Sequence, residues 1–98
     1  MNIIKNTEEK VLTIAVEGRL DTVTAPELEE EIKNIPDEVE ALVLDFANLE
    51  YISSAGLRVL LSAQKTMSKK GSMKLIGVDP DIMEIFEVTG FSDILTIE

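Results

Sequence analysis

The sequence predicts an α/β fold in which a four- to five-stranded mixed, largely parallel sheet packs against three to four helices. After an opening pair of strand-like segments, strand periodicity alternates with helical periodicity along the chain. The run Ala41–Leu44 is apolar throughout, which is typical of a buried parallel strand. Because strand–helix–strand connections are right-handed, this alternation favours a largely parallel sheet. The pattern leaves open whether helices cover one face of the sheet or both.

The first elements are two strands. We expect a short edge strand over residues 2–5. Apolar and polar side chains then alternate from Lys10 to Glu17, which predicts a half-buried strand that ends at Gly18. Residues 19–22 form a polar loop with one apolar anchor, Leu20.

A helix is predicted over residues 25–34. Thr24 and Glu27 have the spacing of a capping box, and a proline lies in the first turn. Apolar residues share one face of this segment and acidic residues the other, and Pro36 stops the helix. The strand Ala41–Asp45 follows.

The second half continues the alternation. A long helix with one apolar face and a polar face of Arg58, Ser62, Lys65 and Lys69 is expected to end at Gly71. A strand over Met73–Val78 follows. Asp79 then caps a helix that begins with proline and ends at Gly90, and a last short strand is expected over Ile94–Ile97.

Length and composition indicate one domain, residues 1–98, with 45% hydrophobic residues and an ordinary core. The sequence has no cysteine, no signal-peptide core and no apolar run of membrane-spanning length, so we expect a cytoplasmic protein and no membrane partner. The formal charge of −10 argues against nucleic acid as a partner. Most acidic residues lie in the first half, as either a solvated helix face or a surface that steers a basic protein partner.

Several kinds of chemistry are excluded by the residues that are missing. Without histidine or cysteine there is no Ser-His-Asp or Cys-His mechanism and no typical zinc site. Ser54 lacks the upstream glycine of a hydrolase elbow, because position 52 is isoleucine. No glycine-rich phosphate loop is present. The prediction is a protein that is not an enzyme and uses no metal and no cofactor of its own.

The junction Ser53-Ser54-Ala55-Gly56 between a buried strand and the long helix is the candidate site. Serine is a favoured helix N-cap, so one of the two serines is expected to act only as a cap. A phosphoserine at a helix N-terminus is stabilised by free N–H groups and the helix dipole, so phosphorylation is the other interpretation. Gly56 lowers helix propensity, either to leave the hydroxyl accessible or to allow tight packing on the sheet.

Four segments of the chain together resemble the bacterial anti-sigma factor antagonists, the small single-domain members of the STAS superfamily. These segments are Gly18–Asp21, Leu42–Asp45, Tyr51–Leu57 and Thr89–Leu95. The resemblance covers nearly the whole chain and implies a STAS-like fold.

In that family the phosphoacceptor signature is typically Asp-Ser-(Ser/Thr/Ala)-Gly-Leu. Aligning Gly56 and Leu57 with it places the acceptor on Ser54, with Ser53 in the position of the usual aspartate and as the second candidate acceptor. Asp21 matches a loop aspartate that lies near the acceptor in relatives, although it can equally be a turn former or a cap. Residues expected at or near the phosphosite and its partner are Asp21, Thr22, Thr24, Ser53, Ala55, Gly56 and Arg58.

The resemblance implies a partner-switching module. The unphosphorylated form would bind an anti-sigma factor that is also a serine kinase and thereby release the sigma factor. The kinase would use its own Mg-ATP to phosphorylate Ser54 and dissociate the complex, and a PP2C-type serine phosphatase would reset it. Two alternatives stay open: a STAS scaffold subunit that is never phosphorylated, as in a lipid-transport ABC system, and a member whose regulation has been lost with Ser53.

Overall fold

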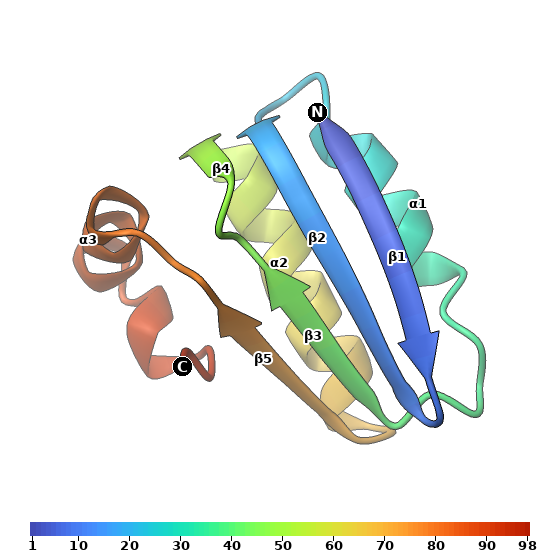
Figure 1. Ribbon diagram of the computed structural model, residues 1–98. Helices are drawn as coiled ribbons and strands as arrows, with labels where there is room; N and C mark the ends of the chain where they lie inside the picture. The colour runs from blue at the N-terminus through green and yellow to red at the C-terminus, as the bar shows by residue number, and fades with distance from the viewer.

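The computed structural model describes residues 1–98. The chain forms, in order, β1 (Asn2–Glu8), β2 (Val11–Leu20), α1 (Ala25–Lys33), β3 (Ala41–Asp45), β4 (Leu49–Ile52), α2 (Ser54–Ser68), β5 (Ser72–Ile76), α3 (Pro80–Thr89) and a short 3₁₀ turn, η1 (Phe91–Asp93) (Figure 1).

The five strands form a mixed sheet in the order β1-β2-β3-β5, and β4 pairs with the far end of β2. β1 and β2 are antiparallel, whereas the pairs β2–β3, β2–β4 and β3–β5 are all parallel. The predicted fold class, a four- to five-stranded, largely parallel sheet with three to four helices, is therefore confirmed, with five strands and three α-helices observed. No helix is long and apolar enough to cross a membrane.

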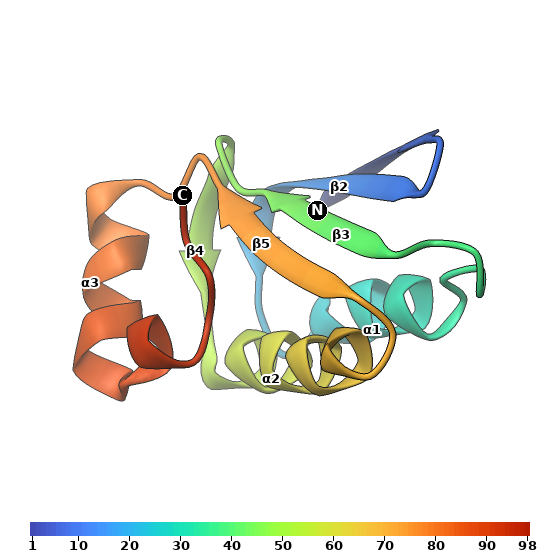
Figure 2. The ribbon, with the colours of Figure 1, turned by 90° about the horizontal axis from the view of Figure 1, so that it is seen from below.

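Helices α1 and α2 lie side by side on one face of the sheet, and the opposite face carries no helix (Figure 2). α3 stands at the end of the molecule next to β4 and β5 (Figures 1 and 2). The sheet pattern agrees with this: Leu12, Ile14 and Val16 of β2 are buried, whereas Ile4 on the open face is 55% exposed. Helices therefore pack on only one face of the sheet, a point that the sequence pattern left open.

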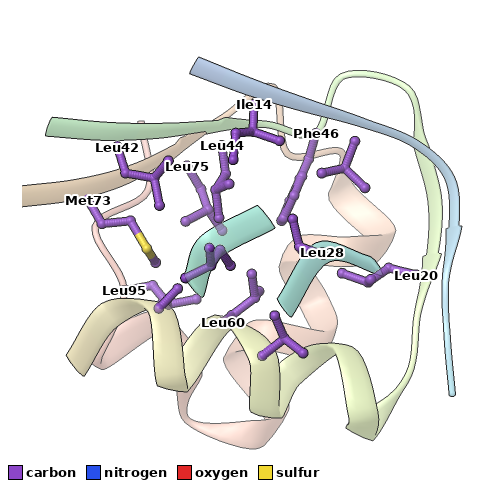
Figure 3. Close-up of a cluster of buried hydrophobic side chains, with 14 of the residues drawn as sticks. Ile14, Leu20, Leu28, Leu42, Leu44, Phe46, Leu60, Met73, Leu75 and Leu95 are labelled. Atoms are coloured by element: carbon purple, nitrogen blue, oxygen red, sulfur yellow. The ribbon is translucent and has the colours of Figure 1, made fainter. Parts of the chain in front are cut away.

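The core lies between this covered face and the helices. Figure 3 shows side chains from the sheet, α1, α2 and the C-terminal segment meeting there. Its fully buried members, each with no exposed side-chain area, include Ile14, Leu20, Leu28, Leu42, Leu44, Phe46, Leu60 and Leu75. The apolar and polar residues that alternate along β2 in the sequence thus point to the core and to the open face, respectively.

The first strands are longer than expected. β1 runs to Glu8, and β2 continues past Gly18 to Leu20. Gly18 has a φ of +92°, and β2 pairs with β4 from this residue on, with a shift of register between Gly18 and Arg19. The expected polar loop therefore begins only at Asp21. Reading Gly18 as the end of the strand was wrong, because β2 continues past it and pairs with β4 across an irregularity in which Glu50 is the extra residue.

The structure differs from the prediction at two short segments, β4 and the C-terminal residues. β4 was missed because its four residues have a buried–exposed–exposed–buried pattern without alternation. The expected strand Ile94–Ile97 was wrong, because the chain folds into η1 and then makes a single bridge between Leu75 and Ile97. The backbone N–H of Leu75 donates to the Thr96 carbonyl, and that of Glu98 to the Leu75 carbonyl, both at 2.9 Å. The C-terminal segment thus covers only part of the outer edge of β5.

Candidate functional site

The junction between β4 and α2 lies beside the end of β2. Leu20 pairs with Ile52 in the parallel register, and the backbone N–H of Ser53 donates to the Leu20 carbonyl at 2.9 Å. The two strands therefore end together, and the loop after β2 starts where α2 starts. This pairing brings Asp21 and the two serines to one end of the molecule.

Ser53 and Ser54 occupy different positions at the start of α2. Ser53 is the N-cap, with an extended backbone, and its Oγ accepts a hydrogen bond from the Gly56 N–H at 3.4 Å. Ser54 is the first helical residue, is exposed, and its hydroxyl makes no hydrogen bond within the protein. The prediction that one serine acts as a cap is confirmed, and that serine is Ser53.

Gly56 is buried against the ends of the two strands. A Cβ at this position would lie 2.8 Å from Ile52 Cγ1, 2.9 Å from Leu20 Cγ and 3.1 Å from the Leu20 carbonyl oxygen. The first two distances are shorter than real Cβ contacts and the third is tighter than most of them, so close packing of α2 on β2 and β4 favours the glycine. Of the two explanations that the sequence allowed for Gly56, packing therefore accounts for it.

Asp21 organises the loop between β2 and α1. Its Oδ1 accepts hydrogen bonds from the backbone N–H groups of Val23 and Thr24, both at 3.1 Å. The hydrogen bond from the Thr24 N–H is the main reason that the pKa of Asp21 is lowered, with smaller contributions from the Thr24 hydroxyl, the Val23 N–H and Arg19. Asp21 is thus a turn former, one of the two roles the sequence suggested for it.

Thr24 does not form the expected capping box. Its backbone is helical, with φ −94° and ψ −21°, and its side chain makes no capping hydrogen bond. Instead the Thr24 hydroxyl donates to the Arg19 carbonyl at 2.8 Å and accepts from the Asp21 N–H at 2.9 Å. The hydroxyl therefore closes the loop back onto β2, and that engagement removes it from the helix end.

An interaction between Arg19 and Tyr51 was not predicted. The register of β2 and β4 places these residues opposite one another, and the Arg19 guanidinium lies 4.1 Å from the centre of the Tyr51 ring. Arg19 Nε is also 3.7 Å from Asp21 Oδ2. The pair connects the strand ends to the loop. No local sequence signal reveals it, because it depends on β4.

The remaining predicted residues surround a shallow hollow between the first turns of α1 and α2. Thr22, Ala55 and Arg58 line it, together with Ala25, Pro26, Glu29 and Val59. Val23, at the tip of the loop, is 83% exposed. The structure therefore gathers all the predicted site residues at one end of the fold, around an exposed serine hydroxyl and the exposed Val23.

The end of the fold that carries Ser54 has no arrangement of side chains typical of an enzyme active site. No basic side chain hydrogen-bonds to Ser54 to activate it, and no group of three or more carboxylates comes together in the manner of a metal site. The exposed hydroxyl can nevertheless be covalently modified or covered by another protein. Its position in the first turn of α2 favours a negative charge there.

Comparison with known proteins identifies the family. Residues 2–98 match the STAS domain family. BtrV of Bordetella bronchiseptica, which is named as an anti-sigma factor antagonist, is 33% identical over 99% of this chain and 85% of its own. An anti-sigma factor antagonist from Mycobacterium paratuberculosis has a structure that superposes with a TM-score of 0.83 at 25% identity, covering 98% of this chain and 83% of the other.

The fold is also that of SpoIIAA, a Bacillus cell fate determinant, in its phosphorylated form. That structure superposes with a TM-score of 0.77 at 16% identity and covers 99% of this chain and 91% of its own. The chain belongs to the anti-sigma factor antagonist family of STAS domain proteins.

Proposed function

We propose that this protein is an anti-sigma factor antagonist that works by partner switching, and that Ser54 is its phosphorylated residue. The observation that carries the proposal is the difference between the two serines. Ser54 is exposed with an unengaged hydroxyl, whereas Ser53 is half-buried and caps α2. The two structures of SpoIIAA support it, because that protein has the same fold in its phosphorylated and its unphosphorylated form.

The proposed cycle begins with the unphosphorylated form, which binds an anti-sigma factor serine kinase and releases the sigma factor. The kinase holds Mg-ATP, and the Ser54 hydroxyl attacks its γ-phosphorus. The Oγ–P bond forms, the bond to ADP breaks, and the hydroxyl proton leaves to a base on the kinase. A PP2C-type serine phosphatase hydrolyses the phosphoester and restores the hydroxyl. The protein itself supplies no catalytic group and no cofactor.

The negative charge of a phosphate on Ser54 explains why the complex with the kinase would dissociate. A phosphoserine brings about two negative charges at neutral pH, and a surface fitted to a neutral hydroxyl must desolvate them. A loss of about 3 kcal/mol is sufficient to weaken binding roughly a hundredfold. The switch therefore requires no rearrangement of the sheet or the helices.

The test is phosphotransfer from the cognate anti-sigma factor kinase and ATP, with the phosphate mapped by mass spectrometry. We expect one phosphate on Ser54 of the wild type and none on Ser54→Ala. Ser53→Ala is the matched control: it should still be labelled, and it should lose about 0.5–1 kcal/mol of stability because α2 loses its cap.

Undiminished labelling of Ser54→Ala would contradict the assignment of the site. A wild type that takes up no phosphate and co-purifies with a membrane permease would support the scaffold role instead.

A further inference from the structure

We propose that the exposed face of α2 is a docking surface that extends from Ser54 and fits an acidic surface of the anti-sigma factor kinase. This inference rests on the proposed function and names the chemistry of its partner. The surface, here called the α2 stripe, consists of Ser54, Arg58, Ser62, Lys65 and Lys69, all of them exposed. Their spacing of four, four, three and four residues places them on one face of the helix. The stripe is about 22 Å long, from the helical rise.

The positive charges of the α2 stripe have no partners within the protein. Lys5, Lys10, Arg19, Lys33 and Lys74 form ion pairs with acidic side chains, and Lys70 Nζ donates to the Pro36 carbonyl at 3.0 Å. Arg58, Lys65 and Lys69 are the three basic residues without an ion pair or a side-chain hydrogen bond. The basic side chains that have neither an ion pair nor a side-chain hydrogen bond are thus all on the stripe.

No acidic side chain forms an ion pair with a cation of the stripe, although Asp37 and Glu29 line a hollow that also contains Ser62. α2 itself contains no acidic residue. The neighbouring helix α1 carries four glutamates, of which Glu29 borders the same hollow as Arg58. Glu29, however, is ion-paired with Lys33 at 3.2 Å, and Glu31 with Lys5. The stripe is therefore a local excess of positive charge on a protein whose net charge is −10.

Such an arrangement selects both the partner and its orientation. An acidic partner surface is repelled by most of this protein and attracted by the α2 stripe. Docking along α2 then places the partner over Ser54, at the end of the stripe. A basic partner surface would instead favour α1, where Glu27 and Glu30 are exposed and free of ion pairs.

The same arrangement explains why phosphate at Ser54 is effective. Arg58 lies four residues after Ser54, within reach of a phosphate on the same helix face. The phosphate brings about two negative charges to a stripe that holds three cations, so the net charge of the stripe falls and its attraction for an acidic surface is weakened most next to Ser54. It also faces the carboxylates of the partner directly.

Carbodiimide cross-linking of the unphosphorylated protein to its cognate anti-sigma factor kinase tests the chemistry of the interface. This reagent joins an amine to a carboxylate that is already in contact with it. We expect mass spectrometry to find Lys65 or Lys69 joined to an aspartate or glutamate of the kinase. Cross-links only between Glu27 or Glu30 and lysines of the kinase would overturn the proposal, since they would place a basic partner on α1.

Charge reversal tests the energetics. Lys65→Glu lies roughly 16 Å along the helix from Ser54 and leaves the phosphosite intact. It should weaken binding to the kinase by roughly tenfold or more at low salt, and by less at high salt. Lys10→Glu is the control, with the same charge change at an exposed residue of the β1–β2 turn that is ion-paired with Glu40. It should change the affinity by no more than about threefold, as a screened long-range effect.

The two levels of the proposal fail in different ways. If the wild type neither binds the kinase nor takes up phosphate, the proposed function is wrong. If the wild type does both, and Lys65→Glu binds as tightly as the wild type, only the α2 docking surface is wrong. Thermal unfolding of Lys65→Glu, expected to match the wild type closely at this exposed position, confirms that the variant is folded.

Discussion

At the scale of single residues, the two neighbouring serines of the site differ in their hydrogen bonding. Ser53 satisfies a backbone N–H at the start of α2, whereas Ser54, one residue later, leaves its hydroxyl to solvent. Asp21 and Thr24 hold the loop between β2 and α1 through hydrogen bonds to its backbone. Gly56 lets α2 approach the strand ends. The residues around the exposed hydroxyl thus fix the backbone of the loop and of the helix start, and the hydroxyl itself stays free.

Gly56→Ala should lower the free energy of unfolding by about 1–2 kcal/mol. Helix propensity alone predicts the opposite sign, a gain of up to about 1 kcal/mol. The clash of the new methyl with Ile52, Leu20 and the Leu20 carbonyl outweighs that gain, because the backbone oxygen cannot move aside. Urea unfolding measures the difference, with Ser62→Ala at an exposed position of the same helix as the control, expected within about 0.5 kcal/mol of wild type. A stabilised Gly56→Ala would refute the packing explanation.

Asp21→Asn should be less stable than the wild type near neutral pH, and the difference should shrink in acid. The pKa of Asp21 in the folded protein lies below its ordinary value of 3.8, because its carboxylate accepts hydrogen bonds from Thr24 first of all. Its contribution to stability is therefore present above pH 3.8 and is lost as the pH falls through the folded-state pKa. Unfolding by urea at a series of pH values measures this. A stability difference that does not change with pH would show that the charge of Asp21 is unimportant.

At the scale of elements, the β1–β2 hairpin contains the one backbone strain in the fold outside glycine. Its two-residue turn is Glu9-Lys10, and Glu9 has a φ of +58°, a left-handed conformation that disfavours residues with a Cβ. The hairpin forms nevertheless, because seven residue pairs align β1 with β2.

Glu9→Gly should therefore raise the free energy of unfolding by up to about 1 kcal/mol, since glycine adopts a positive φ without steric strain. Lys10→Gly is the matched control: its φ is not positive, so the substitution brings only the entropic cost of glycine and should destabilise slightly. Thermal or urea unfolding of both variants decides the matter. Equal effects of the two substitutions would argue against strain at Glu9.

At the scale of the whole molecule, packing places an acidic helix directly beside a basic one. α1 and α2 lie side by side on the covered face of the sheet (Figure 2). The charges of each helix are visible in the sequence, but the unpaired state of Arg58, Lys65 and Lys69 depends on which acidic groups the fold brings near them. The molecule therefore has distinct charged sides although its net charge of −10 suggests a uniformly acidic protein.

The sequence by itself determined the alternation of strands and helices, the fold class, the serine junction and the absence of histidine and cysteine. These are local properties, because each follows from which residues share a face of one element or from which side chains exist at all. The N-cap Asp79 belongs here as well, since capping acts within three residues. A serine cap for α2 was predicted too, but only the structure identified it as Ser53.

Only the tertiary structure decided the pairing of β4 with β2, the reason for Gly56, the contact of Arg19 with Tyr51 and the single bridge made by the C-terminal segment. Each joins residues that are distant in the chain, and their pairing is selected by the packing of the whole core. The same reason explains Thr24: a capping box was available locally, but hydrogen bonds to Arg19 and Asp21 engaged its hydroxyl instead.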